Sequence, residues 1–168
     1  HERYVIAQLE GEGDLAAELA DALDPLPFDP DVAVAESTTD RERLWAFREL
    51  INESIRELGV PHKLDVAVPL ARLPAFVAGA GEAVGDARLF LYGHLGDGNV
   101  HVNVLGAGEK VDERILRLAT GLGGTISAEH GVGIAKSRYL SLCRSEADVA
   151  AMRARKQALD PDRILAPG

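Results

Sequence analysis

The chain has little cysteine, few aromatic residues and no long hydrophobic run, and each scarcity excludes a class of protein. Its single cysteine, Cys143, cannot form an internal disulfide, so no disulfide framework supports the fold. Because Cys143 follows an apolar helical stretch, we expect a small core filler rather than a nucleophile. No run of about 18 apolar residues occurs, so the sequence predicts no transmembrane segment. The net charge of −9 argues against a nucleic-acid partner.

The 168 residues, 46% of them hydrophobic, are enough for one domain with a real core. Runs of strand-forming residues, bounded by turn signals, predict strands at residues 3–9, 31–35, 64–68, 87–92 and 100–105. Helical periodicity predicts helices at residues 14–23, 40–58, 70–84, 111–122, 137–142 and 145–159. The predicted N-caps are Asp14 for the first, Ser37 or Thr38 for the second and Ser145 for the last. Their order, with short connections, predicts an α+β fold: an antiparallel sheet with helices on one face, followed by C-terminal helices.

The most informative stretch is residues 92–103, where two strand-forming runs flank a Gly-Asp-Gly-Asn turn. Asp-Gly between apolar runs predicts a β-hairpin, which would bring His94 and His101 together. Along the second strand, His101 and Asn103 point to one face and three valines point to the other. We expect Asp97, inside the turn, to cap the turn rather than to bind a ligand.

A glycine-rich loop at residues 123–133 adds the carboxylate of Glu129 and the imidazole of His130. Imidazoles with a carboxylate are the ligand set of a divalent transition metal that keeps an open position. A lone histidine is usually structural, but this grouping favours a metal site. From spacing alone, Arg48 could be a solvated helix charge and Lys63 could face water.

Three motifs together resemble the C-terminal domain of FAD-linked oxidases, a family that includes D-lactate dehydrogenases, glycolate oxidase subunits and D-2-hydroxyglutarate dehydrogenases. They lie at residues 94–101, 124–133 and 160–168, and the resemblance covers residues 1–168. It implies a ferredoxin-like sheet that caps a separate FAD-binding domain. That N-terminal domain is not among these residues, so we expect a fragment of a longer chain whose partner is its own FAD-binding domain.

The resemblance also assigns roles to individual residues. The metal ligands would be His94, His101 and Glu129, with zinc or manganese as the expected metal. The catalytic base, placed beside the flavin and in contact with it, would be His130.

Further matches would hold the substrate. The carboxylate would be bound by Arg48 and Lys63, and Asn103 would assist near the substrate. Some relatives have threonine one helical turn after the arginine, where this chain has Asn52, so the substrate stays open.

The leading hypothesis is the substrate- and metal-binding domain of an FAD-dependent 2-hydroxyacid dehydrogenase. Such an enzyme oxidises a D-2-hydroxyacid to a 2-oxoacid and transfers hydride to FAD, which is held mostly by the N-terminal domain. We expect a cytoplasmic protein, peripheral to the membrane only through an electron acceptor. The face that meets the FAD domain could also form a homodimer. Two alternatives stay open: a stand-alone metal-dependent hydrolase and a non-catalytic ligand-binding module.

Overall fold

The structure is a computed structural model that describes residues 3–28, 30–35 and 37–165. The chain divides into two compact units, His1–Ser54 and Ile55–Gly168, and each is described by itself. The last three residues of the third motif, 166–168, lie outside the described residues. No helix among the described residues combines the length and the apolar character needed to span a membrane.

The first unit contains helices α1 (Leu15–Leu23) and α2 (Thr38–Glu49), and α3 (Ile51–Glu57) begins in it. The structure confirms Asp14 as the N-cap of α1 and, of the two candidates Ser37 and Thr38, makes Ser37 the N-cap of α2. Asp14 accepts a hydrogen bond from the backbone N–H of Ala17, and Ser37 accepts one from that of Asp40. Each bond satisfies a donor that the first helical turn leaves without an intrahelical partner.

Three predictions for the first unit are wrong. Residues 3–9 are rich in strand-forming side chains and residues 31–35 alternate as strands do, but the structure assigns them no strand, because neither pattern specifies the strand with which they would pair. The helix predicted at 40–58 is interrupted at Leu50, whose N–H is shared between the carbonyls of Ala46 and Arg48. This bifurcated bond tightens the last turn of α2 before α3 begins.

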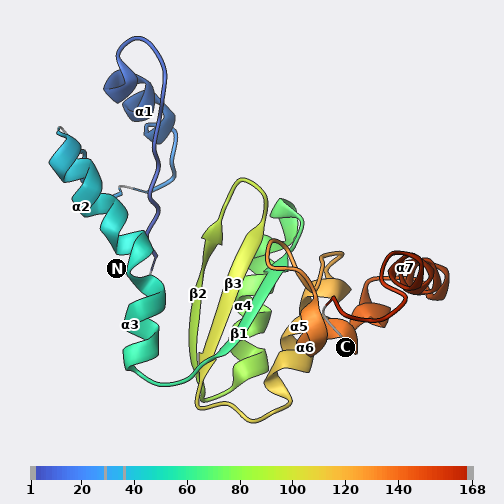
Figure 1. Cartoon of the computed structure of the whole chain (residues 1–168). Helices are drawn as coiled ribbons and strands as arrows, with labels where there is room; N and C mark the ends of the chain where they lie inside the picture. The colour runs from blue at the N-terminus through green and yellow to red at the C-terminus, as the bar shows by residue number, and fades with distance from the viewer. Residues whose placement is uncertain (1–2, 29, 36, 166–168) are drawn as a thin grey trace. The chain divides into compact units, whose positions relative to one another are not determined.

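The second unit is built on a three-stranded antiparallel sheet of β1 (His62–Ala67), β2 (Arg88–His94) and β3 (Asn99–Leu105) (Figure 1). The strand order is β1-β3-β2. After the helices, Thr125 forms an isolated antiparallel bridge with Ala67 at the outer edge of β1. A βαββαβ ferredoxin-like fold places its fourth strand there, so the predicted α+β class is confirmed.

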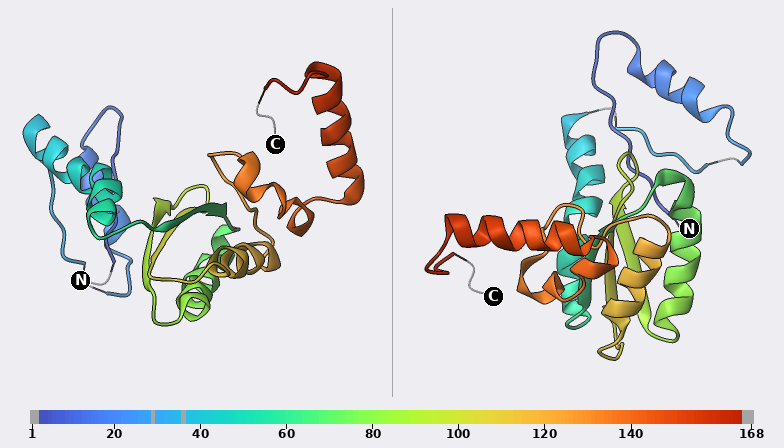
Figure 2. Two further views of the ribbon diagram at one scale, coloured as in Figure 1. Left: turned by 60° about the horizontal axis from the view of Figure 1, so that its bottom comes forward. Right: turned by 90° about the vertical axis from the view of Figure 1, so that its right-hand side faces the viewer.

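Helices α4 (Leu73–Val84) and α5 (Val111–Gly121) cover one face of this sheet, as two views show (Figures 1 and 2). Phe76 of α4 and Ile115 of α5 are fully buried against the inward side chains of the strands. The strand residues that complete this core are Leu64, Val66, Val100, Val102 and Val104. Their alternation leaves the intervening residues on the opposite face.

Two 3-10 turns and two helices complete the second unit: η1 (Leu70–Arg72), α6 (Gly133–Ser137), η2 (Leu140–Leu142) and α7 (Glu146–Leu159). The helix predicted at 70–84 is therefore η1 followed by α4, and the one predicted at 137–142 is a turn of η2 after the end of α6. Ser145 caps α7 as predicted, in a reciprocal capping box with Asp148. Cys143 packs against the core, as expected of a filler.

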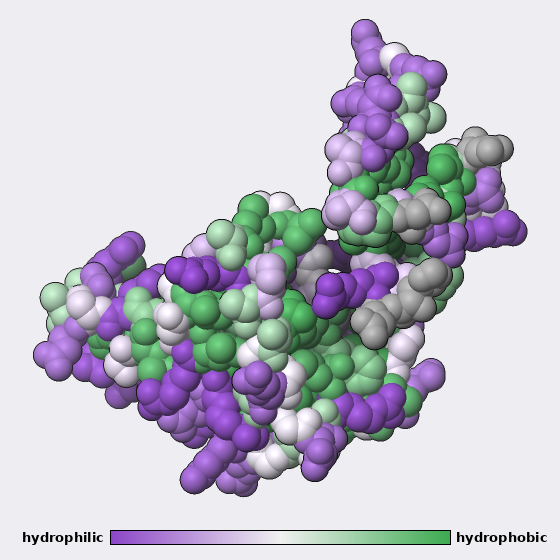
Figure 3. Space-filling view, turned by 180° about the vertical axis from the view of Figure 1, so that it is seen from behind, coloured by the Kyte–Doolittle hydropathy of each residue, from purple (hydrophilic) through white to green (hydrophobic). Residues whose placement is uncertain are grey.

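Apolar side chains also reach the surface, as the green areas of Figure 3 show. Exposed examples are Val32 and Phe47 in the first unit and Val60 and Ile134 in the second. In the first unit, α1 and the segment after it line a hollow of about 550 Å³. The residues of this hollow are mostly apolar, and none of them is a metal ligand or a catalytic group assigned above.

Candidate functional site

The polar face of the sheet lies opposite the face that packs against α4 and α5. Strand register aligns Asp65, His101 and Tyr92 across the three strands. Two residues along the strands, on the same face, Lys63 pairs with Asn103. Directly opposed residues of an antiparallel pair have Cβ atoms about 5 Å apart, so these side chains share one surface.

The predicted hairpin is confirmed, and it closes one end of this face. Asp97 Oδ1 accepts a hydrogen bond of 2.9 Å from the Asn99 N–H, the turn role expected of it. Gly98 has φ +71°, and a Cβ there would lie 2.1 Å from the Val68 carbonyl oxygen, so only glycine fits. The turn brings the rings of His94 and His101 to a centroid distance of 6.0 Å.

The glycine-rich loop returns to the edge of β1 and delivers Glu129 and His130 to the same face. The Thr125 N–H donates to the Ala67 carbonyl oxygen at 2.9 Å. Glu129 Oε1 then lies 2.9 Å from His94 Nδ1. The His130 ring stacks on that of His101 with centroids 5.4 Å apart and 16° between planes. The structure therefore brings together all four residues for which the sequence predicted metal binding or base chemistry.

Asp65 is the residue of this cluster that sequence reasoning missed. It is only 2% exposed, and its Oδ2 accepts three consecutive backbone N–H bonds, from Ala128, Glu129 and His130. Its Oδ1 lies 3.5 Å from His101 Nδ1. The sequence did contain a signal for a special role of Asp65. Aspartate is depleted in strands, and this one lies between core residues of β1.

Burial and hydrogen bonding shift three pKa values in this cluster. Burial alone would raise the pKa of Asp65, but N–H bonds from His130 and Glu129, helped by the charges of His130 and Lys136, lower it overall. Burial lowers the pKa of His101, against the opposing effect of Asp65. Burial likewise lowers the pKa of Lys136. The site therefore favours an ionised carboxylate beside a neutral imidazole.

Two groups of side chains have ligand atoms close enough to share a metal ion. One contains Asp65, His101 and His130, and the other contains His94, Asp97 and Glu129. The predicted ligand set takes His94 and Glu129 from one group and His101 from the other. Four buried side-chain atoms on this face have no hydrogen-bond partner among the described residues: Asp65 Oδ1, Asn103 Oδ1, and both Oδ1 and Nδ2 of Asn99.

The remaining predicted residues are divided between the units. Lys63 is exposed on the polar face, beside the buried Asn103. Arg48 lies on α2 in the first unit, with its guanidinium carbon 5.9 Å from the centre of the Trp45 ring. Its grouping with Lys63 stays a prediction.

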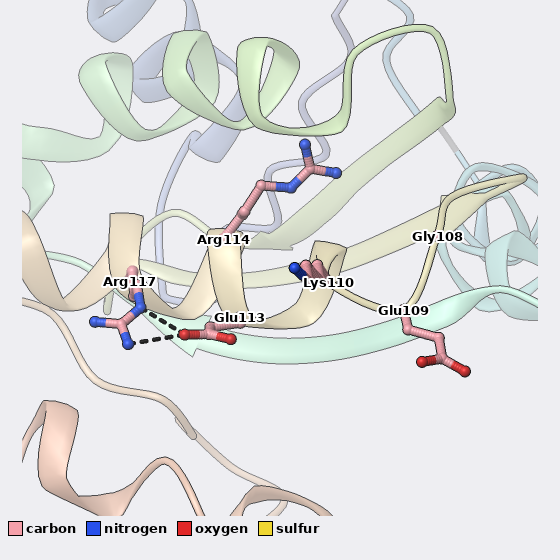
Figure 4. Close-up of a pocket in the computed structure, with 6 residues that line it drawn as sticks. All are labelled: Gly108, Glu109, Lys110, Glu113, Arg114 and Arg117. Atoms are coloured by element: carbon pink, nitrogen blue, oxygen red, sulfur yellow. Dashed lines mark hydrogen bonds and ion pairs between the residues drawn. The ribbon is translucent and has the colours of Figure 1, made fainter.

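The second unit also has a hollow whose lining residues are none of those in this cluster. It measures about 630 Å³ and surrounds the first turns of α5, beyond the end of β3 that lies away from the histidine hairpin (Figure 4). Its ion pair joins Arg117 to Glu113 at 2.8 Å, one helical turn apart. An exposed pair of this kind contributes little beyond local helix stability.

The chain is similar to a known protein family over nearly its whole length. A family model described as FAD linked oxidases, C-terminal domain, matches residues 7–168. A D-2-hydroxyglutarate dehydrogenase of Stutzerimonas stutzeri is 35% identical over 153 residues, covering 82% of this chain and 33% of that protein. The mitochondrial D-2-hydroxyglutarate dehydrogenase of Bos taurus is 36% identical over 135 residues, covering 74% of this chain and 24% of that protein. The chain thus spans about a third or less of the length of these curated relatives.

Proposed function

The chain belongs to the family of FAD-linked oxidase C-terminal domains, and we propose that it is the substrate- and metal-binding domain of an FAD-dependent D-2-hydroxyacid dehydrogenase. The observation that carries the proposal is the convergence of three histidines and two carboxylates on one open sheet face. Relatives named D-2-hydroxyglutarate dehydrogenase favour a dicarboxylic 2-hydroxyacid as the first substrate to test.

The donors on this face fit a divalent ion. Two imidazoles and a carboxylate suit zinc or manganese, and the contact between His94 Nδ1 and Glu129 Oε1 brings two of the three ligands together. We propose that His94, His101 and Glu129 hold the ion. A bound ion would polarise the hydroxyl and carboxylate oxygens of the substrate and lower the pKa of the hydroxyl.

The side chains around these ligands would bind and deprotonate the substrate. His130 is 65% exposed at the edge of the cluster, so a substrate hydroxyl can approach its ring and lose a proton to it. Lys63 would attract a carboxylate, and Asn103, whose own buried Oδ1 has no hydrogen-bond partner among the described residues, would accept a hydrogen bond from the substrate. Arg48, on α2 of the first unit, is proposed by itself to bind a substrate carboxylate, since a guanidinium can bind one through two parallel bonds.

FAD, when bound, supplies the acceptor for the hydride that leaves the substrate α-carbon. The described residues do not fit its phosphates, because no Gly-x-Gly-x-x-Gly motif follows a strand in this sequence. We therefore assign FAD binding to another part of the protein, and this chain expressed alone should be colourless. A yellow preparation with stoichiometric flavin would contradict that assignment.

The proposal is tested by flavin reduction in the full-length protein that carries this domain. Stopped-flow absorbance with D-2-hydroxyglutarate, D-lactate and other D-2-hydroxyacids should show rapid bleaching with at least one of them. Chelation of the metal, or His94→Ala, should slow reduction by roughly 10²-fold or more, as expected when transition-state charge stabilisation is lost.

His62→Ala is the matched control. His62 is also half-buried and also contacts a carboxylate, Asp112, at 2.9 Å, but that pair joins β1 to α5 away from the cluster. His62→Ala should therefore leave the rate of reduction within about twofold, as for a residue outside the transition-state contacts. Equal effects of the two substitutions, or no reduction with any D-2-hydroxyacid, would refute the proposed function.

A further inference from the structure

We propose that Asp65 is the positioning residue of this site: one carboxylate oxygen holds the Glu129-His130 loop on the sheet and the other orients His101. The proposal rests on the proposed function, in which Glu129 and His101 bind the metal and His130 accepts the proton. Nothing in the spacing of the three motifs points to Asp65, which precedes the first of them by 29 residues (94 − 65).

Oδ2 of Asp65 holds the Glu129-His130 loop on the sheet. Three consecutive N–H groups, those of Ala128, Glu129 and His130, point at this one oxygen at 3.1, 2.8 and 2.9 Å. A run of backbone donors converging on an anion is a strong, charge-assisted arrangement. Because the acceptor is on a central position of β1, the loop is anchored to the rigid sheet at the two residues that carry its chemistry.

Oδ1 of Asp65 faces the ring of His101. This atom is buried and has no hydrogen-bond partner among the described residues, and His101 Nδ1 lies 3.5 Å from it. A buried carboxylate oxygen favours a proton on the facing nitrogen. Without that proton, the lone pair of the nitrogen would face a lone pair of the oxygen and repel it. His101 then carries its proton on Nδ1 and keeps the lone pair of Nε2 for a metal ion.

A metal-bound histidine commonly donates its second ring N–H to a carboxylate, which fixes the ring and raises its basicity. Here the same carboxylate also holds the loop that supplies the next ligand. Asp65 therefore couples two ligands that are far apart in the sequence. Losing the charge should weaken metal binding without removing any ligand.

The first experiment measures the tautomer of His101 in the metal-free full-length protein. Histidine is labelled with ¹⁵N, the spectrum is recorded at pH 8, and His101→Gln assigns the signal. We expect the proton on Nδ1 in the wild-type protein. In Asp65→Asn the amide oxygen can still accept the three N–H bonds, which turns the NH₂ group toward His101, so we expect the proton to move to Nε2. A proton on Nε2 in the wild-type protein would overturn the proposal, whatever the variant does.

The second experiment measures zinc affinity by competition with a chromophoric chelator. Asp65→Asn should bind zinc about 10–100-fold more weakly, the usual effect of losing an outer-shell partner, and excess zinc should restore flavin reduction. The matched control is Asp112→Asn, which removes the carboxylate facing His62 and should change zinc affinity less than twofold. Equal affinities for folded Asp65→Asn and wild type would refute the role of Asp65.

Failure of the proposed function would look different. If His94→Ala and Glu129→Ala both left zinc affinity unchanged, the ligand assignment would be wrong, whereas the tautomer of His101 would still report on Asp65. If Asp65→Asn did not fold, as judged by its melting curve, the wild-type tautomer alone would decide.

Discussion

Gly124 is the residue whose replacement should most directly separate the loop from the sheet. A Cβ at this position would lie 2.2 Å from the Ala67 carbonyl oxygen and 2.8 Å from that of Ala119. Ordinary contact begins at 3.4 Å, so in Gly124→Ala the loop must move by more than an ångström. Both carbonyls are acceptors in this region: Thr125 N–H donates to Ala67 and Gly124 N–H donates to Ala119, each at 2.9 Å.

The expected cost follows from these contacts. Overpacking against backbone costs about 1–3 kcal/mol, and two displaced hydrogen bonds cost about 0.5–1.5 kcal/mol each. Gly124→Ala should therefore lower the free energy of unfolding by roughly 2–6 kcal/mol. Because the displaced loop carries Glu129, zinc affinity should also fall by at least about tenfold, in the range seen when support for a ligand is lost.

Urea unfolding followed by circular dichroism tests the stability of the chain, with Gly121→Ala as the matched control. Gly121 ends α5, and a Cβ there would meet nothing within 4 Å. Alanine in that helical position should stabilise the protein by about 0.4–1 kcal/mol. Coincident midpoints for the two variants would refute the close approach as the reason for glycine at position 124.

Three further predictions concern the base, the C-terminal turn and the core. His130→Ala should slow flavin reduction by roughly 10²–10⁴-fold in stopped flow, as for a lost general base, and a rate near wild type would exclude that role. Lys156, with N–H bonds from Ile164 and Leu165, holds the pKa of Asp160 below its usual value of 3.8. The turn should therefore keep its amide-exchange protection above about pH 4 and lose it as the pH falls through the lowered pKa, and Asp160→Asn should lack most of it at pH 6. Equal protection of the turn in Asp160→Asn and in the wild-type protein at pH 6 would contradict this linkage. Phe76→Ala should cost about 3–5 kcal/mol in urea unfolding, because the side chain is fully buried, and a loss under 1 kcal/mol would refute its place in the core.

Local chemistry explains what the sequence determined by itself. Asp14, Ser37 and Ser145 predicted helix starts because a cap acts within three residues of its own position. The Gly-Asp-Gly-Asn turn predicted the hairpin, since a two-strand hairpin is also a short-range structure. Alternation along β3 predicted that His101 and Asn103 share a face, and the structure confirms that arrangement.

Contacts between distant segments were decided only by the tertiary structure. Residues 3–9 are as rich in strand-forming side chains as β1, yet the structure assigns a strand to β1 and not to them, because a local pattern does not encode the identity of a pairing partner. Likewise, Asp65 and the N–H groups of the loop are 63–65 residues apart, and no local pattern records that they meet. β1 pairs with β3, and the loop returns to the edge of β1. Asp65 of β1 therefore lies between His101 and the backbone of the loop.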